Sequence, residues 1–315
     1  MPKQQFDNRI LIGIFAVLAI IYFGTDYART QKRSGNKSLP TLAIFSNDEV
    51  DKIRLTAPDS EAPIEVMRTG ANEWEVTQSD KRYTADPQMV ERYFRDLKAL
   101  KTTRLISRKA ERKSDYSVND SLGTRVQVFA GDETLSDFYV GRFKYSPSAG
   151  GFGGITYVRE AEVDDIYAVE GFQNPNINKP LADWRIQRVL QFERDEVEDL
   201  VWTYPADSGF VLNQTTNGWK VDAAAADSVK AINFIIGLSS LRDRNFYEGE
   251  VPQTEPDFRL KLSLRKSGMQ EVQAWKHPNE EDSFLSRSTM NQEAYFTSKK
   301  NGLFQKLFPK KDRFF

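Results

Sequence analysis

Apolar and polar side chains alternate along short stretches in both halves of the chain, and a period of two predicts β-strands with one wet face. The strands expected on this basis cover residues 50–55, 64–66, 74–76, 125–129, 135–140 and 166–169 in the first half, and residues 258–264, 272–275 and 294–296 in the second. Turn sequences at 130–133 and 266–269 predict hairpins. We therefore expect mainly antiparallel sheets, with three short strands ahead of the first helix.

One principal helix is expected in each half. Asp86 before Pro87 predicts a helix start, because an aspartate accepts amide hydrogen bonds at the N-cap and proline fits the first helical turn. Asp227 takes the same place in the second half. Apolar residues then recur every three or four positions: Val90, Phe94, Leu97 and Leu100 in the first helix, and Ile232, Ile235, Leu238 and Leu241 in the second. Such a stripe indicates a helix that covers a sheet.

The two halves also resemble each other in sequence. Residues 45–56 align with residues 192–203 and share five of twelve positions. Trp74 then aligns with Trp219 and Ala85-Asp86 with Ala226-Asp227, at a slowly shrinking offset that indicates shorter loops in the second copy. A repeat of this length predicts two similar modules packed side by side. We read both tryptophans as core residues.

An apolar stretch precedes the repeat; it is uncharged over residues 10–24, and its extension to Tyr27 admits only Thr25 and Asp26 as polar residues. As a helix, residues 10–27 would be about 27 Å long, enough to cross a thin hydrocarbon core with tyrosines at the interface. No small-x-small cleavage site follows it, because Tyr22 and Asp26 occupy the positions where small residues are needed. We expect an uncleaved transmembrane anchor rather than a signal peptide.

The orientation of this anchor can be argued both ways. Four basic residues follow the span, namely Arg29, Lys32, Arg33 and Lys37, and positive-inside counting then favours a cytoplasmic body. A short basic head before a first hydrophobic segment favours a translocated body, which is our expectation. The four basic residues would then contact anionic headgroups from the outer side, with a solvated linker as the alternative.

These patterns predict an α+β protein with an N-terminal transmembrane helix and two tandem, internally repeated modules, each a mainly antiparallel sheet with one principal helix. The expected divisions are a head (1–9), the anchor (10–27), a polar linker (28–43), a first module (44–190) and a second module (191–315). The chain has 315 residues, 39% of them hydrophobic, which suffices for two cores. Lys plus Arg number 44 against 45 for Asp plus Glu, a balance that disfavours nucleic acid as a partner.

The sequence offers little catalytic chemistry. It contains no cysteine, which removes thiol nucleophiles, thiolate metal sites and disulfides. The single histidine, His277, lacks the partners of a triad or a metal site and reads as a loop residue. Acidic pairs at 48–49 and 195–196 fit turns ahead of strands better than acid/base catalysis. We expect no catalytic, cofactor-binding or metal-binding residues.

A glycine-rich loop at 146–154 lacks the Gly-Lys-Ser/Thr ending of a phosphate loop and reads as a flexible hairpin tip. Its aromatic residues make it a candidate surface for partner contact, comprising Tyr145, Gly150, Gly151, Phe152 and Gly153. Arg159 and Arg287 recur and are expected to pair with carboxylates, with an anion site as the alternative. The aromatic and basic tail 303–315 is expected to dock on the second module, with a membrane or partner contact as the alternative.

Several short motifs together resemble one bacterial family. They are Asp51-Lys52-Ile53, Trp74-Glu75-Val76, Ala85-Asp86, Tyr157-Val158-Arg159 and Asp183-Trp184-Arg185. The chain resembles the uncharacterised family DUF4340 over most of residues 44–300, and departs from it in the glycine-rich tip and at Trp184. The resemblance implies an extracytoplasmic, membrane-tethered module, associated in some relatives with permeases of gliding-type ABC transport systems. No catalytic residues carry over.

From these observations we expect a non-enzymatic accessory or scaffold protein of a cell-envelope or transport-associated complex. It would be a single-pass protein of the bacterial inner membrane with extracytoplasmic modules, and its partners would be the bilayer, through residues 10–27, and permease or other membrane-protein subunits. One alternative is a ligand-binding protein with a small polar molecule between the modules. A second alternative is a hydrolase that uses paired carboxylates.

Overall fold

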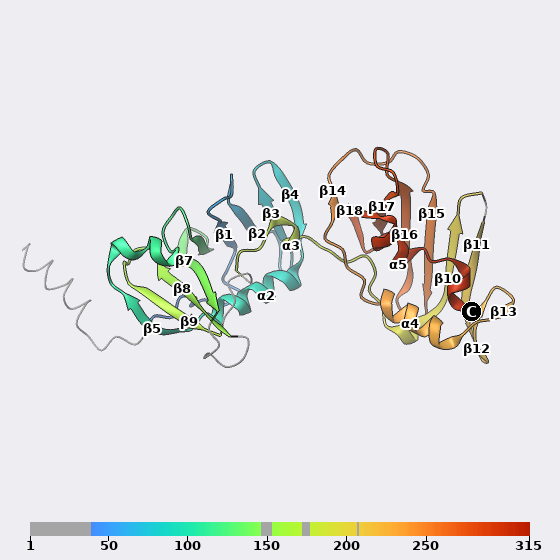
Figure 1. Ribbon diagram of the computed structural model, residues 1–315, viewed down its shortest axis with the longest axis horizontal. Coiled ribbons are helices and arrows are strands. Elements are labelled where there is room, and N and C mark those ends of the chain that lie inside the picture. The colour runs from blue at the N-terminus through green and yellow to red at the C-terminus, as the bar shows by residue number, and fades with distance from the viewer. Residues whose placement is uncertain (1–38, 146–152, 172–176, 207) are drawn as a thin grey trace, which may run out of the picture.

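The computed structural model describes residues 39–145, 153–171, 177–206 and 208–315, and in these ranges it contains two nine-stranded antiparallel sheets (Figure 1). From edge to edge, the first sheet runs β4 (Lys81–Ala85), β3 (Trp74–Gln78), β2 (Ile64–Arg68), β1 (Lys52–Thr56), β6 (Thr124–Ala130), β7 (Glu133–Tyr145), β8 (Gly154–Glu160), β9 (Ile166–Glu170) and β5 (Thr102–Ser107). The second runs β13 (Ala224–Ala225), β12 (Gly218–Val221), β11 (Ser208–Thr215), β10 (Val197–Tyr204), β15 (Phe258–Leu264), β16 (Gly268–Lys276), β17 (Ser283–Ser288), β18 (Asn291–Lys299) and β14 (Phe246–Tyr247). The strands follow one another in the same spatial order in both sheets, which confirms two modules built on one repeated plan.

Each module carries one principal helix between the same two strands of its plan. α2 (Pro87–Lys98) links the edge strand β4 to the opposite edge strand β5, and α4 (Ser228–Leu238) links β13 to β14. The N-cap carboxylates are those expected, since Asp86 accepts from the backbone N–H of Gln88 and Asp227 from those of Val229 and Lys230. The buried faces are Val90, Tyr93, Phe94 and Leu97 in α2, and Ala231, Phe234, Ile235 and Leu238 in α4. Ile232 of the expected stripe is half-buried and packs against the same core at its margin.

The shorter helical segments lie around these elements. They are α3 (Leu181–Trp184), α5 (Gln305–Leu307), η1 (Ala110–Arg112), η2 (Ser114–Tyr116), η4 (Arg194–Glu196), η5 (Lys300–Phe304) and η6 (Lys311–Phe314). The C-terminal group η5, α5 and η6 packs on the second module, where Leu303, Phe304, Leu307, Phe308 and Phe314 are buried in its core. Trp202 of β10 donates its Nε1–H to Leu307 O at 2.9 Å. The expected docking of the tail is confirmed.

The expectation of three strands before the first helix was wrong, because β4 forms a fourth. Lys81 and Arg82 are exposed and Tyr83 is half-buried, so this strand shows no run of alternating apolar residues. It forms through its ladder with β3, across a turn in which Ser79 adopts a left-handed conformation at φ 54°. A strand at a sheet edge needs little apolar surface, and the alternation rule misses it for that reason.

Both modules are closed by an aromatic residue that packs against their helix. The N-cap residue of α2 donates its backbone N–H to Trp184 O at 2.7 Å, and that of α4 donates to Phe314 O at 2.8 Å. Both rings are fully buried. Trp184 meets Tyr93 edge-on at 4.7 Å between centroids, and Phe314 meets Phe234 edge-on at 5.2 Å. Trp184 and Phe314 are thus equivalent residues of the repeat, and Trp184 closes the first module.

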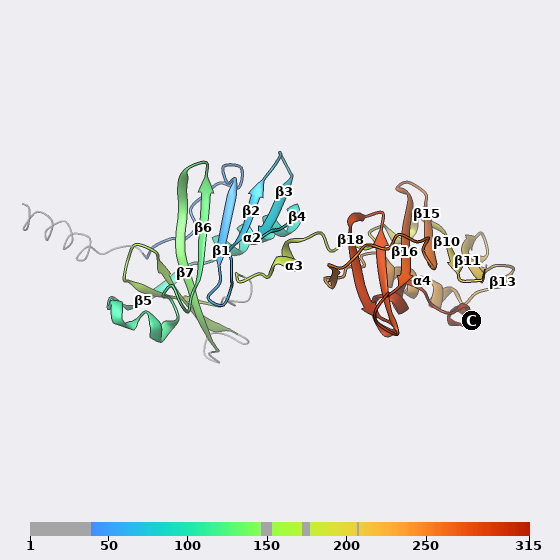
Figure 2. The same ribbon diagram turned by 90° about the horizontal axis from the view of Figure 1, so that it is seen from above.

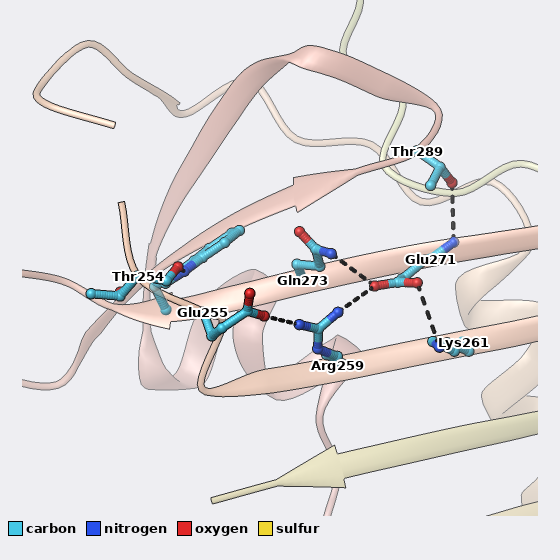
Figure 3. Close-up of polar contacts among 8 residues, drawn as sticks. Thr254, Glu255, Arg259, Lys261, Glu271, Gln273 and Thr289 are labelled. Atoms are coloured by element: carbon cyan, nitrogen blue, oxygen red, sulfur yellow. Dashed lines mark hydrogen bonds and ion pairs between the residues drawn. The ribbon is translucent and has the colours of Figure 1, made fainter. Parts of the chain in front are cut away.

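The face of the second sheet turned away from α4 carries charged side chains on β15 and β16, beside a small buried cluster of Trp275, Leu285 and Tyr295. Figure 3 shows Glu271 on β16 at the centre of this face, with Arg259 at 3.4 Å and Lys261 at 4.0 Å on β15. Gln273 donates to the same carboxylate at 2.9 Å. Leu260, between these cations, and Leu262, directly after them, are fully buried on the side of α4. The side chains of Arg259 and Glu271 are 31% and 18% exposed, so this network lies on a partly solvated surface of the sheet.

Candidate functional site at the junction of the two modules

The two modules meet through opposite edges of their sheets, and Figures 1 and 2 both place β4 of the first module beside the β14 and β18 edge of the second. The chain passes between them directly after Trp184. Isolated bridges join Ala85 to Arg185 and Arg188 to Arg242, so the connecting segment pairs with both modules in turn. The side chains that point into this junction are mostly charged.

Arg185 lies at the centre of the junction. Its side chain is only 9% exposed and its guanidinium stacks between two rings, with Cζ 3.6 Å from the centroid of Tyr83 and 3.7 Å from that of Phe246. Its Nη1 donates to Glu248, and the hydroxyl of Tyr83 donates to the same carboxylate. We call Arg185, Tyr83, Phe246 and Glu248 the arginine clamp. Tyr83 comes from the first module and Phe246 and Glu248 from the second, so the clamp joins the two.

The clamp perturbs the acidity of its own members. Burial, together with the hydrogen bond to Glu248 and its negative charge, raises the pKa of Tyr83 to about 12. Burial opposes ionisation of Glu248 as well, but the hydrogen bonds from Tyr83 and Arg185 outweigh it and hold the pKa of that carboxyl below its ordinary value. Tyr83 is therefore a protonated donor and Glu248 an ionised acceptor at neutral pH.

Asp86 joins the helix cap to the junction. Its residue surface is 2% exposed, and its carboxylate accepts from the backbone N–H of Gln88 at 3.1 Å. Two guanidinium groups face it, that of Arg188 at 3.8 Å and that of Arg242 at 3.6 Å. A second acid, Asp183, lies 3.8 Å from Arg244. The N-cap of α2 is thus also the point at which arginines of the connecting segment and of the second module converge.

Direct hydrogen bonds complete the contact. Thr84 of β4 donates its hydroxyl to Glu293 of β18 at 2.8 Å, and Asn291 donates its Nδ2–H to Ile186 O at 2.5 Å. These bonds link the edge strand of the first sheet, and the segment that connects the two modules, to the opposite edge of the second sheet.

Two cavities open at this junction. The first, of about 200 Å³, is lined by Asp86, Gln88, Met89, Arg92, Lys179, Asp183, Arg185, Gln187, Arg242 and Arg244. The second, of about 400 Å³, is lined by Lys81, Tyr83, Leu181, Ala182, Arg185, Arg244, Asn245, Phe246, Glu248 and Thr297. They share Arg185 and Arg244, so they are neighbouring cavities that contact the same two arginines. We call the first of them the junction cavity.

The candidate partner surface is only partly described. Tyr145 ends β7 and is 55% exposed, and Gly153 is half-buried directly before β8. The remaining members, Gly150, Gly151 and Phe152, lie outside the described residues, as do the anchor 10–27 and the basic residues Arg29, Lys32, Arg33 and Lys37. The contact roles of all these residues stay predictions.

The acidic pairs lie in turns, as the sequence indicates. Asp48 and Glu49 form a turn before β1, in which Glu49 accepts from the backbone N–H of Ser46 at 2.5 Å. Asp195 and Glu196 lie in the short helical turn η4 before β10. His277 follows β16 and meets the ring of Tyr247 edge-on at 5.3 Å between centroids.

The expected carboxylate partners of the two repeated arginines were wrong. Arg159 is buried and donates to backbone carbonyls, among them that of Val118 at 2.8 Å and that of Ala161 at 2.7 Å. Arg287 donates to the carbonyl of Gln292 at 2.9 Å. Each also lies near a tyrosine ring, Tyr139 for Arg159 and Tyr295 for Arg287. Five donors in one plane can satisfy several loop carbonyls at once, which explains an arginine at these places.

Sequence reasoning missed the clamp residues and Arg242. A signal existed in the repeat itself, because residues that differ between otherwise aligned copies are free to serve the contact between them. Tyr83 and Thr84 align with Ala224 and Ala225 in the register that aligns Ala85 with Ala226. The side chains that reach the other module are thus ones that the second copy lacks.

Two features are absent from the described ranges. Within residues 39–145, 153–171, 177–206 and 208–315, no helix is long and apolar enough to cross a membrane. In the same part of the chain, no group of three or more histidine, aspartate or glutamate side chains is placed to hold a metal ion.

Comparison with known proteins gives one family. The model of a domain of unknown function, DUF4340, matches residues 74–261, which is more than half of the chain. The matched region runs from β3 to β15 and includes the whole connection between the modules. No curated protein and no solved structure matches the chain.

Proposed function

Since the chain belongs to the DUF4340 family, a domain family of unknown function, we propose from its architecture that it is a non-enzymatic, membrane-anchored accessory protein. Its tandem modules bind protein partners in the cell envelope, in a transport complex that contains permease subunits or in another membrane complex. The observation that carries this proposal is the arginine clamp, which ties two modules of one plan into a unit.

The physical argument concerns the relative placement of two binding surfaces. Guanidinium stacking between two rings, with a charge-assisted hydrogen bond to a carboxylate, is directional and resists rotation of one module against the other. Two modules held in this way present their sheets to partners at a set spacing. A scaffold needs such a spacing, since it aligns subunits rather than transforming a substrate.

Membrane attachment supplies the second half of the proposal. Residues 10–27 would hold the modules at the bacterial inner membrane, on its extracytoplasmic side, through the linker 28–43. Confinement near the membrane raises the effective concentration of the modules for membrane partners without any new contact. The basic residues of the linker would contact anionic headgroups.

The partner surface of the proposal lies at the end of β7. Tyr145 is a large exposed aromatic at that position, and aromatic residues are enriched where proteins bind one another. The glycine-rich loop 146–154 would present it to a permease subunit.

Site-specific photocrosslinking in cells tests the proposal. A photoreactive residue is placed at Tyr145 in the full-length protein, and at Met269 as a control, since Met269 is 63% exposed at the start of β16. We expect one discrete adduct with an integral membrane protein from position 145 and none from position 269. Equal adducts from both positions, or none from either, would remove the support for a partner surface at β7.

A small-ligand binding protein is the second candidate function. It is favoured by one observation, the pair of cavities of about 200 Å³ and about 400 Å³ at the junction. Ligand sites commonly lie at interfaces between domains, lined by a few convergent polar groups.

A further inference from the structure

The junction cavity carries an excess of positive charge. Its lining includes the cations Arg92, Lys179, Arg185, Arg242 and Arg244, against the two acids Asp86 and Asp183. The ion pair between Glu248 and Arg185 in the arginine clamp neutralises one more of these cations. Two positive charges therefore stay unmatched in a cavity of about 200 Å³ between two packed modules.

The ion pairs inside this cavity are too long for direct hydrogen bonds. Arg242 and Arg188 stand 3.6 Å and 3.8 Å from the carboxylate of Asp86, and Arg244 stands 3.8 Å from that of Asp183. Hydrogen bonds between charged nitrogen and oxygen atoms are about 2.7–2.9 Å long. The guanidinium groups thus face the acids across a gap and keep donors that these acids do not satisfy.

A buried donor beside the cavity is also left without a hydrogen-bond partner. Arg188 Nε is buried and has no hydrogen-bond partner among the described residues. Buried polar groups in proteins are nearly always satisfied. Arg188 does not line the cavity, but it shares the carboxylate of Asp86 with Arg242, so this one acid faces two cations. Unmatched guanidinium and ammonium donors around one small cavity are therefore the complement of an oxyanion.

We propose that the junction cavity binds a small oxyanion, a carboxylate or phosphate group carried by a small molecule. Arg92 and Lys179 from the first module and Arg242 and Arg244 from the second converge on it, so a bound anion bridges the modules. The neighbouring cavity of about 400 Å³ accommodates the uncharged part of the ligand against Leu181 and Ala182. This inference rests on the second candidate function and is independent of membrane attachment and of the partner surface at β7.

The test is titration calorimetry on the full-length protein in detergent, with inorganic phosphate and citrate as probes and sodium chloride at matched ionic strength as the blank. We expect saturable binding of at least one probe with a stoichiometry of one. Phosphate alone identifies a phosphate ligand, citrate alone identifies a carboxylate ligand, and binding of both supports the shared oxyanion chemistry. Heats no larger than those of chloride for both probes overturn the proposal.

Charge-removing variants locate the site. The double variant Arg92→Gln/Lys179→Gln removes one cation from α2 and one from the segment before α3, and neither residue has an ion pair in the described part of the chain. We expect it to weaken binding about tenfold or more, the usual effect of losing charge-assisted hydrogen bonds. Arg82→Gln is the matched control, because Arg82 is exposed on β4 and pairs with Glu75 outside both cavities.

The second variant, Arg244→Gln, removes a cation from the other module. We expect a similar loss of affinity, because Arg244 lines both cavities and its side chain is 70% exposed, so the fold does not depend on it. Binding that survives in both variants at wild-type affinity places the anion elsewhere and refutes the site. Crosslinking from Tyr145 is unaffected by either result, so failure here leaves the scaffold proposal standing.

Discussion

Arg185 depends on properties that a lysine does not have. Its guanidinium is flat and delocalised, so it stacks on Tyr83 and Phe246 at the same time while its edge donates to Glu248. A lysine ammonium is a compact, strongly hydrated charge. It would pair with the carboxylate but could not stack on the two rings. The identity of this one residue therefore decides how firmly the modules are joined.

Arg185→Lys tests this point. We expect a loss of about 1–2 kcal/mol in the free energy of unfolding, because stacking on two rings is lost at a site that is nine-tenths buried. Urea denaturation of the full-length protein measures the loss. Arg82→Lys, on the edge strand β4 with a largely exposed side chain, is the control and should change stability by less than about 0.5 kcal/mol. Equal effects of the two substitutions would mean that the stacking contributes nothing.

The titrating members of the clamp predict how its stability depends on pH. The raised pKa of Tyr83 means that its contribution is complete below the ordinary 10.0 and is lost as pH rises from there through about 12. The lowered pKa of Glu248 acts in the other direction, so its contribution is complete above the ordinary 4.5 and is lost as pH falls through the lowered value. Tyr83→Phe should abolish part of the alkaline loss seen in urea midpoints measured across this range. An identical alkaline profile in wild type and variant would contradict the assignment.

The helices show which elements a sequence can predict. Both helix starts were predicted correctly, because a capping aspartate and a stripe at helical spacing are local signals. β4 was missed because an edge strand needs few apolar residues. The sequence did not reveal the role of Trp184, which we expected to be a departure from the family. Its equivalence to Phe314 depends on a hydrogen bond to Asp86, almost a hundred positions earlier. Contacts of this range leave no periodic trace.

The closing aromatic of each module is the clearest prediction at the scale of elements. Phe314→Ala should cost about 3–5 kcal/mol, because it empties a fully buried site against Phe234 and Trp202. Phe315→Ala is the control, since Phe315 is 48% exposed. We expect thermal unfolding of the Phe314→Ala protein to split into two transitions, with the second module unfolding first. A single unshifted transition would show that the tail is dispensable.

At the scale of the whole molecule, the junction between the modules joins unlike edges. β4 of one module meets the β14 and β18 edge of the other, a head-to-tail contact that could propagate from chain to chain if both free edges carried the same residues. The free edges carry different residues, because the second copy has Ala224 and Ala225 where the first copy has Tyr83 and Thr84. The difference between the copies confines the clamp to one junction in each chain.

The features of the molecule that could be predicted from the sequence are those encoded within each module, and the contact between the modules could not be predicted. Two modules, their sheets and their helices follow from alternation, capping and the internal repeat, all of which are visible within short windows. The clamp and the junction cavity combine Tyr83, Arg185, Arg242 and Glu248 from separate places in the chain. Only the fold brings these residues together, and no spacing rule marks them.

The central claim is that both modules stand outside the cytoplasm on an uncleaved anchor. The most direct measurement fuses a reporter active only outside the cytoplasm, and separately one active only inside it, after Phe315 of the full-length chain. The account predicts activity from the outside reporter, silence from the inside reporter, and a fusion that stays with the membrane fraction. Activity from the inside reporter alone would contradict it, and would make the basic residues Arg29 to Lys37 the true determinant of orientation.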